Sequence, residues 1–341
     1  MTRGVKKWTY QDRIIAPSLP AADFGRVGAE TSRAALTRSA ALASIAVAFL
    51  LIGLKAWAAL STGSTAMLGS LADTTLDFIA SVATLMGVWA AAQPADREHR
   101  FGHGKAEALA AMFQVALISL SALTLAFRSI SQFIVGARTE AANEGIAVSV
   151  IALVATFGLL AWQRHVIRKT GSIAIATDHL HYKSDVLLNL AVIAALALDQ
   201  YAGLAGADPI FGFGIALWLG WGAWHASSEA IDQLLDREWP EEKRERFIQV
   251  LGRHPELRGV HDLRTRTSGN RDFVQFHVWV DGRMTVTEAH RVMDEIEYKL
   301  LKEFPGVEIL IHPDPEGHVD ETGMAAEDVL AAVEESVNKP S

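Results

Sequence analysis

Six apolar runs, each long enough to cross a lipid bilayer, follow one another through the first two thirds of this chain. They cover residues 39–60, 66–92, 108–135, 145–163, 174–200 and 209–228. A hydrocarbon core of roughly 30 Å needs about 20 helical residues. Half of the 341 residues are hydrophobic, which is more than an ordinary soluble protein carries. The sequence therefore predicts an all-α, six-helix transmembrane bundle.

Basic residues indicate which side of the membrane is cytoplasmic, because short cytoplasmic loops are enriched in Lys and Arg. The face opposite the two basic loops offers only Arg138. The loop after the second run and the loop after the fourth together carry Arg97, Arg100, Lys105, Arg164, Arg168 and Lys169. Since an even number of spans leaves both termini on one side, we expect both termini to be cytoplasmic.

Composition divides the chain into four parts. Residues 1–36 form a cytoplasmic arm with several basic residues and no apolar segment of the kind found in a signal peptide. Residues 37–236 form the transmembrane domain, residues 237–317 read as a cytoplasmic domain, and residues 318–341 form an acidic tail. The net charge of −8 argues against a nucleic-acid partner.

The cytoplasmic domain is predicted to have the element order α-β-β-α-β. A helix should begin after Pro240, since proline suits the first turn of a helix. In the second strand Val274, Phe276, Val278 and Val280 alternate as a core face, so His277 should point away from the core. The predicted elements are a helix at 241–254, strands at 259–267 and 272–280 joined by a turn at 268–270, a helix at 287–304 and a strand at 307–312.

Two pairs of ionisable residues interrupt the apolar runs. Asp73 and Asp77 lie in the second run, and His181 and Asp185 lie in the fifth. The spacing i, i+4 projects both members of a pair from one helix face. A charged group at mid-membrane costs roughly 2.5–3.5 kcal/mol even on a lenient scale. A divalent cation held between the two helices by one imidazole and three carboxylates would offset this cost and have a tetrahedral shell.

A structural explanation of these pairs stays open. The alternative is that the second run is a buried helix of a soluble bundle whose carboxylates cap a helix or pair with Arg. The length of the run, and the lack of a basic residue that reaches mid-depth, favour the ion site. Taken alone, His181 and Asp185 belong to a polar patch with Asp178, His179 and Lys183 that could be the wet cytoplasmic end of the fifth span.

The ligand types narrow the choice of ion. The chain has no cysteine, so nitrogen and oxygen must bind the metal. One imidazole among carboxylates favours Zn²⁺, and Cd²⁺, Fe²⁺ and Co²⁺ stay open. Metal binding needs a neutral imidazole and ionised carboxylates, so protons compete for the site. Helices that alternate access would therefore exchange metal for protons.

Three other charges within the runs have structural interpretations. Lys55 and Arg128 lie near the outer ends of the first and third runs, where a long side chain can reach the headgroups. Lys183 lies two residues after His181, about 200° around the helix, so we expect it to face a different surface.

The order of these motifs resembles that of the cation diffusion facilitator family, and within it the bacterial zinc efflux branch. The likeness runs from about Arg38 to Pro315. Its segments are Ser70-Leu71-Ala72-Asp73-Thr74-Thr75-Leu76-Asp77, Pro94-Ala95-Asp96, Phe101-Gly102-His103-Gly104-Lys105-Ala106-Glu107, His181-Tyr182-Lys183-Ser184-Asp185, Gly259-Val260-His261-Asp262-Leu263-Arg264-Thr265-Arg266 and Ile311-His312-Pro313-Asp314-Pro315.

The resemblance implies three metal sites and one charge pair. The transport site would consist of Asp73, Asp77, His181 and Asp185. A second zinc would bind in the loop at Asp96, His99 and His103, although the residues alone suit a solvated loop equally well. A hinge charge pair would join Lys105 to Asp236. A two-zinc cluster holding a homodimer together would involve His261, His277, His290, His312 and Asp314, which without the resemblance read as separate surface residues.

The function that the resemblance implies is a secondary active transporter. We expect a homodimeric Zn²⁺/H⁺ antiporter that exports zinc across the bacterial inner membrane, with a ferredoxin-like, metallochaperone-like cytoplasmic domain. An intramembrane metalloenzyme needs an open coordination position, and four protein ligands without a His-Glu-x-x-His motif argue against one. A membrane-anchored zinc sensor would leave the Asp73–Asp77 pair unexplained.

Overall fold

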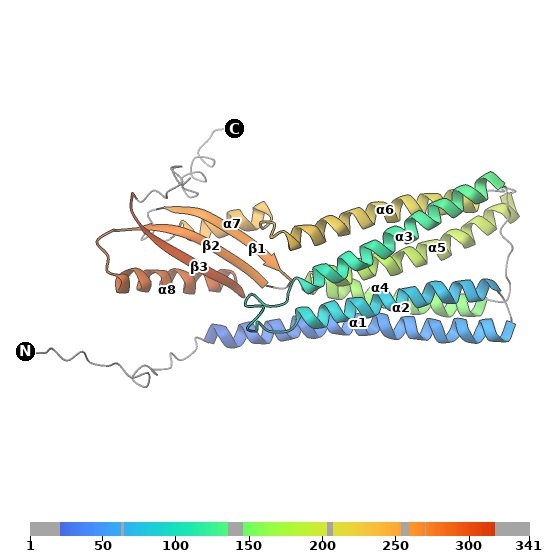
Figure 1. Cartoon of the computed structure of the whole chain (residues 1–341), viewed down its shortest axis with the longest axis horizontal. Coiled ribbons are helices and arrows are strands. Elements are labelled where there is room, and N and C mark those ends of the chain that lie inside the picture. The colour runs from blue at the N-terminus through green and yellow to red at the C-terminus, as the bar shows by residue number, and fades with distance from the viewer. Residues whose placement is uncertain are drawn as a thin grey trace, which may run out of the picture.

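In the computed structural model of the chain, a helical bundle carries a small α/β domain at one end (Figure 1). The structure describes residues 21–62, 65–135, 146–202, 207–253, 259–269 and 271–317. The predicted acidic tail at 318–341 and the first twenty residues of the predicted arm lie outside the described residues.

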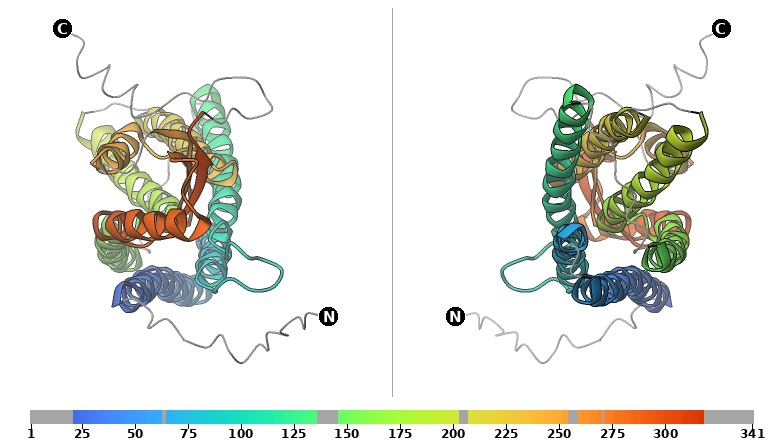
Figure 2. Two further views of the ribbon diagram at one scale, coloured as in Figure 1. Left: turned by 90° about the vertical axis from the view of Figure 1, so that its left-hand side faces the viewer. Right: turned by 90° about the vertical axis from the view of Figure 1, so that its right-hand side faces the viewer.

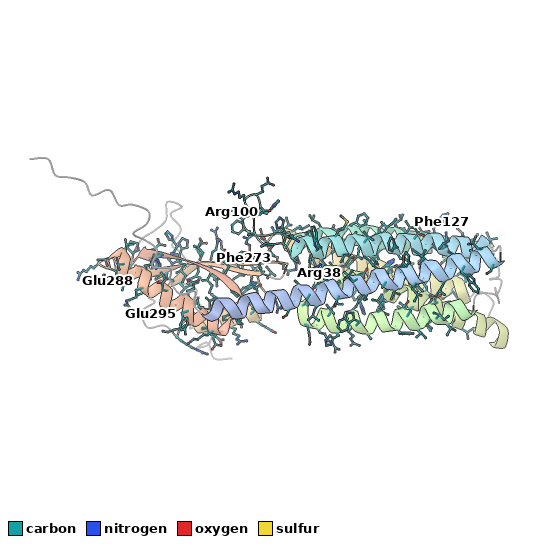
Figure 3. All side chains as sticks on the ribbon, turned by 90° about the horizontal axis from the view of Figure 1, so that it is seen from below. Arg38, Arg100, Phe127, Phe273, Glu288 and Glu295 are labelled. Atoms are coloured by element: carbon teal, nitrogen blue, oxygen red, sulfur yellow. The ribbon has the colours of Figure 1, made fainter. Side chains whose placement is uncertain are left out.

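The bundle consists of six long helices. Four stretches of the described helices are long and apolar enough to cross a membrane, namely Ser32–Ser61, Asp73–Ala91, Ala106–Val135 and Val150–Thr170. Large apolar side chains project from the outside of the bundle, as a lipid-facing surface requires (Figure 3). The helices are α1 (Ala21–Thr62), α2 (Thr65–Ala91), α3 (Ala106–Val135), α4 (Ile146–Thr170), α5 (Ile173–Ala202) and α6 (Ala207–Leu234).

The first helix begins earlier than the apolar pattern predicts. α1 starts at Ala21 and has 42 residues, so the end of the predicted N-terminal arm is helical. The added segment is rich in Ala, with Glu30 and Arg33, and these residue types favour helix without needing an apolar face.

Small residues allow the helices to pack closely. α3 packs against α6, α1 against α2, and α2 and α5 against each other. A Cβ atom added to Gly87 of α2 would lie 2.3 Å from the Cβ atom of Ala110 in α3. Small side chains at such crossings bring helix backbones together, which is the usual packing of membrane helices.

The cytoplasmic domain has the predicted α-β-β-α-β order. Its elements are α7 (Glu241–Leu251), β1 (Val260–Ser268), β2 (Arg271–Val280), α8 (Val286–Glu303) and β3 (Val307–Pro315). β2 lies in the middle of the sheet, antiparallel to β1 and parallel to β3. The predicted core face is confirmed, because Val274, Phe276, Val278 and Val280 are buried in one cluster with residues of α7 and α8.

Two strands of this domain depart from the simple pattern. β3 extends to Pro315 rather than ending at His312, so Asp314 also lies in the sheet. β1 has an irregular register between His261 and Arg264, and Asp262 adopts a left-handed backbone with φ of 49°. Such a bulge redirects side chains that strict alternation would place on known faces.

The end of the α2–α3 loop next to α3 packs against the turn that joins β1 and β2 (Figure 1). The rest of this loop projects from the side of the bundle (Figure 2). Arg266 packs against two rings that also contact each other, with its guanidinium carbon 4.7 Å from the ring centroid of Phe101 and 4.5 Å from that of Phe273. A Cβ atom added to Gly104 would lie 2.3 Å from the backbone oxygen of Ser268. The cytoplasmic domain is therefore fitted directly to the membrane bundle.

We predict that Gly104→Ala separates the loop from the β1–β2 turn. A backbone overlap of this kind costs about 1–3 kcal/mol, so amide hydrogen exchange in the loop should accelerate roughly tenfold. Hydrogen-exchange mass spectrometry on the full chain, followed at residues 92–105 and 260–280, measures the effect. Gly158→Ala on α4 is the control, because a Cβ atom there meets nothing within 4 Å. Equal exchange in the two variants would contradict the prediction.

Candidate metal centres

An intramembrane cluster forms where α2 meets α5. The ligand atoms of Asp77, His181 and Asp185 all lie within 4.8 Å of one another. His181 Nε2 is 2.8 Å from Asp77 Oδ1, across the contact between the two helices. The side chains of His181 and Asp77 are only 10% and 20% exposed. One imidazole and two carboxylates therefore converge at a partly enclosed point of the bundle.

Asp73, the fourth predicted ligand, does not belong to this group of ligand atoms within 4.8 Å of one another. It precedes Asp77 by one helical turn on α2, and its side chain is exposed. Its charge still acts on Asp185 of α5. The structure thus assembles three of the four predicted residues and leaves Asp73 close by on the same helix.

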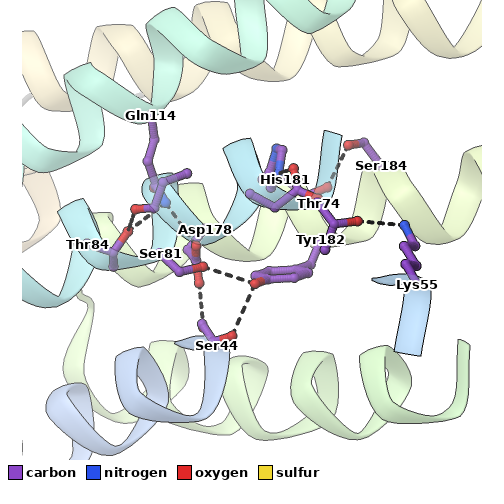
Figure 4. Close-up of polar contacts among 12 residues, drawn as sticks. Ser44, Lys55, Thr74, Ser81, Thr84, Gln114, Asp178, His181, Tyr182 and Ser184 are labelled. Atoms are coloured by element: carbon purple, nitrogen blue, oxygen red, sulfur yellow. Dashed lines mark hydrogen bonds and ion pairs between the residues drawn. The ribbon is translucent and has the colours of Figure 1, made fainter. Parts of the chain in front are cut away.

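A buried hydrogen-bond network lies beside this cluster, and sequence reasoning missed it (Figure 4). Asp178 is fully buried rather than part of a wet helix end. Its carboxylate accepts hydrogen bonds from Ser44 Oγ at 2.6 Å, Gln163 Nε2 at 2.8 Å and Gln114 Nε2 at 2.9 Å. Gln114 also donates to Thr84 Oγ1 at 2.6 Å. The network joins five helices, and the polar residues Gln114 and Gln163 within apolar runs were the available signal.

The two lysines of this region point in different directions. The prediction that the Lys55 side chain reaches the outer headgroups is wrong. Its Nζ donates a 2.6 Å hydrogen bond to Oγ1 of Thr74, which is buried on α2 between Asp73 and Asp77. Lys183 is exposed on a different surface, as predicted, with Nζ 5.2 Å from the ring centroid of Trp218 on α6.

A second group of ligands lies in the loop between α2 and α3. The ligand atoms of Asp96, His99 and His103 lie within 4.8 Å of one another. Both imidazoles face the carboxylate, with His99 Nδ1 and His103 Nε2 each 3.4 Å from an Asp96 oxygen. The backbone N–H groups of His99 and Glu98 donate to Asp96 Oδ1 at 2.6 and 2.8 Å and hold the pKa of this carboxyl below its usual range. The loop therefore presents an ionised carboxylate between two imidazoles.

A third group lies on the sheet face opposite the core of the cytoplasmic domain. Strand register places His261 opposite His277, and His277 opposite His312. All three imidazoles approach Asp314, with distances of 3.3 Å from His261 Nε2, 2.9 Å from His277 Nδ1 and 3.2 Å from His312 Nε2. Burial raises the pKa of Asp314, but the hydrogen bond from His277 and the charge of His312 outweigh burial and hold this pKa below its usual value.

One predicted member of this group lies elsewhere, and one unpredicted residue joins it. His290 is on α8, where its side chain is 73% exposed and its Nδ1 is 3.1 Å from Asp294 Oδ1. Asp262 Oδ2 lies 3.8 Å from His277 Nε2, because the bulge in β1 turns the aspartate toward the histidines. Within one chain, His290 does not meet the other four predicted residues.

The predicted hinge residues lie together at the end of α6. Lys105 Nζ is 3.0 Å from Asp236 Oδ1 and donates to the backbone oxygen of Leu234 at 3.1 Å. Arg266 of β1 also reaches Asp236, with Nη1 3.3 Å from Oδ1. Asp236 has a left-handed backbone with φ of 56°. The Asp236 carboxylate thus contacts one cationic side chain from the loop and a second cationic side chain from the cytoplasmic sheet.

Comparison with known proteins gives two family matches. Residues 41–235 match the cation efflux transmembrane domain, and residues 239–316 match the cytoplasmic domain of cation efflux proteins, a dimerisation domain. The chain is 44% identical over 293 residues to a protein named cation-efflux pump FieF from Cronobacter sakazakii, which covers 86% of this chain and 94% of the relative. A FieF pump from Serratia proteamaculans is 42% identical over 286 residues, which cover 84% of this chain and 95% of the relative.

These matches span the bundle and the cytoplasmic domain, and the relatives are named as pumps rather than enzymes. The chain accordingly belongs to the cation efflux family, also called the cation diffusion facilitator family, and is a membrane cation efflux transporter.

Proposed function

We propose that the protein is a homodimeric Zn²⁺/H⁺ antiporter that exports zinc from the cytoplasm. The observation that carries the proposal is the convergence of Asp77, His181 and Asp185 inside the bundle. Two carboxylates and one imidazole suit Zn²⁺, and Cd²⁺, Fe²⁺ and Co²⁺ accept the same donor atoms. Asp73 supplies the fourth ligand in this proposal, since it lies one turn from Asp77 on the same helix.

Proton coupling follows from the contact between His181 and Asp77. Their nearest atoms are 2.8 Å apart, a distance that requires a proton between them. In the proposed exchange the empty site holds His181 as an imidazolium beside the ionised Asp77 carboxylate, so a metal ion that binds Nε2 releases one net proton, because the ligating imidazole is neutral. Release of the metal on the far side leaves the site ready to take up a proton again.

The proposed topology has six spans with both termini in the cytoplasm of a bacterium, across its inner membrane. Arg168 and Lys169 lie in the last turn of α4, and Arg100 projects from the loop between α2 and α3 (Figure 3). Both segments are at the end of the bundle that carries the α/β domain (Figure 1). Basic residues gathered at one end support a cytoplasmic location for that end. We place the domain boundary after Asp236, where α6 has ended.

The other two groups of ligands are proposed as resident zinc sites. Three imidazoles and the Asp314 carboxylate provide nitrogen and oxygen donors of the kind that structural zinc sites use. His290 is exposed on α8 and is available to a second chain, which supports a role in the dimer. Asp96, His99 and His103 would bind zinc in the loop that contacts the cytoplasmic sheet. Metal bound there would stabilise the junction between membrane and cytoplasmic parts.

We predict that Asp77→Asn and His181→Ala each reduce zinc transport at least about 100-fold. Each change removes a ligand that links α2 to α5, and loss of an outer-shell partner alone costs 10–100-fold at metal sites. Zinc uptake by the full chain in proteoliposomes, driven by an imposed pH gradient, measures the effect. His225→Ala is the matched control, because this histidine is exposed on α6.

Wild-type uptake by the Asp77 or His181 variant would rule out the assigned transport site. Metal uptake that does not depend on the pH gradient would rule out proton coupling but not the site. A chain that binds zinc in the cytoplasmic domain and carries no zinc flux would instead be a membrane-anchored sensor.

We predict that Asp314→Ala weakens zinc binding by the cytoplasmic domain at least about 100-fold, since three imidazoles converge on this carboxylate. Elemental analysis of the purified full chain should show less bound zinc, and native mass spectrometry should show more monomer. Glu308→Ala is the control, because Glu308 is an exposed carboxylate on β3 that takes no part in the cluster. Unchanged zinc content in the Asp314 variant would exclude this cluster as a metal site.

A further inference from the structure

Lys55 brings a positive charge to the intramembrane ligands from a third helix. α1 packs against α2, and the Lys55 Nζ donates a 2.6 Å hydrogen bond to Thr74 Oγ1 (Figure 4). Thr74 is only 1% exposed and lies between Asp73 and Asp77. The ammonium group is therefore held inside the bundle, beside the segment that carries the predicted ligands.

Burial disfavours the charge of the Lys55 ammonium, and the nearby carboxylates of the proposed site, Asp77, Asp185 and Asp73, favour it. Lys55 is in turn among the charges that act on Asp185. Because the bundle interior screens charges less than water does, these interactions are stronger than those of a surface lysine. The ammonium and the metal therefore compete for the same carboxylates.

The number of charges in the site shows how Lys55 affects the binding of a divalent cation. Three ionised carboxylates carry three negative charges, and one ammonium group offsets one of them. The two charges that are left match one divalent cation. Without Lys55, the same carboxylates would attract a divalent cation more strongly and release it more slowly, and a transported ion must bind weakly enough to leave.

We propose that Lys55 is a built-in counter-charge of the transport site, which limits the affinity for the divalent cation and so permits its release. The inference rests on the proposed function, because it assigns Lys55 a part in that same site. Lys55 is a positioning residue in this scheme, since its ammonium acts through the carboxylates and Thr74 and does not bind the metal.

Snorkelling toward the headgroups is the ordinary alternative for a lysine near a helix end. It predicts an ammonium directed toward lipid or water and no effect of its charge on transport. The hydrogen bond to a buried hydroxyl argues against this alternative. Lys183 offers the comparison, because its ammonium lies over the ring of Trp218 on an exposed surface.

The test is zinc uptake by the full chain in proteoliposomes at about pH 8, where free carboxylates are ionised. Lys55→Met keeps the length of the side chain and removes its charge. We expect the KM for zinc to fall at least fivefold and kcat to fall with it, because tighter binding before transport slows release. Lys55→Arg keeps the charge and should restore most of both values. Lys183→Met is the matched control and should behave as wild type.

Wild-type KM and kcat in Lys55→Met, or a higher KM, would overturn the inference. If Lys55→Met fails to fold, Thr74→Val decides alone, since it keeps the lysine and removes the hydrogen bond that holds the ammonium in place. A KM about twofold lower in Thr74→Val supports the inference, and an unchanged KM overturns it. Asp77→Asn separates the two proposals. Wild-type uptake by Asp77→Asn would rule out the proposed function. Loss of uptake in Asp77→Asn together with unchanged kinetics in Lys55→Met would rule out only the role of Lys55.

Discussion

The contact between His181 and Asp77 is the interaction on which the membrane domain depends. It places an imidazole 2.8 Å from a carboxylate inside the bundle, with Asp185 beside them. Charged groups in such a place are costly unless other groups or ions compensate them. α2 and α5 must therefore stay together as long as the cluster is filled by protons or by metal. A bundle that changes access to this point has to move around a fixed pair of helices.

The surroundings of the cluster show how the rest of the bundle supports α5. Asp178, one turn before His181, accepts hydrogen bonds from Ser44 of α1, Gln114 of α3 and Gln163 of α4. A buried hydrogen-bond network of this kind fixes the relative positions of the helices that it joins. At the end of the bundle that carries the α/β domain, Lys105 and Arg266 share the carboxylate of Asp236. The loop that carries Asp96, His99 and His103 is therefore tied to both the sheet and the bundle, so the metal proposed to bind in this loop would act at the junction.

Periodicity explains which features the sequence could predict. The i, i+4 spacing of His181 and Asp185, and the alternation around Phe276, follow from helix and strand geometry. Features set by tertiary packing were not predictable. The bulge that turns Asp262 toward His277 breaks the alternation from which its direction would be inferred. From the sequence, Lys55 near a helix end is predicted to anchor at the lipid headgroups. Only the packing of α2 against α1 shows that Thr74 lies beside it. The separation of His290 from the cluster depends on where α8 crosses the sheet.

Anomalous diffraction at the zinc absorption edge, on crystals of the full chain grown with zinc, tests the central claim most directly. The account predicts a zinc peak between Asp77, His181 Nε2 and Asp185, within direct ligand distance of each. This peak should disappear in Asp77→Asn, while peaks at Asp314 and in the loop persist. Zinc at the loop and cytoplasmic clusters of the wild-type protein, with no peak between α2 and α5, would contradict the account.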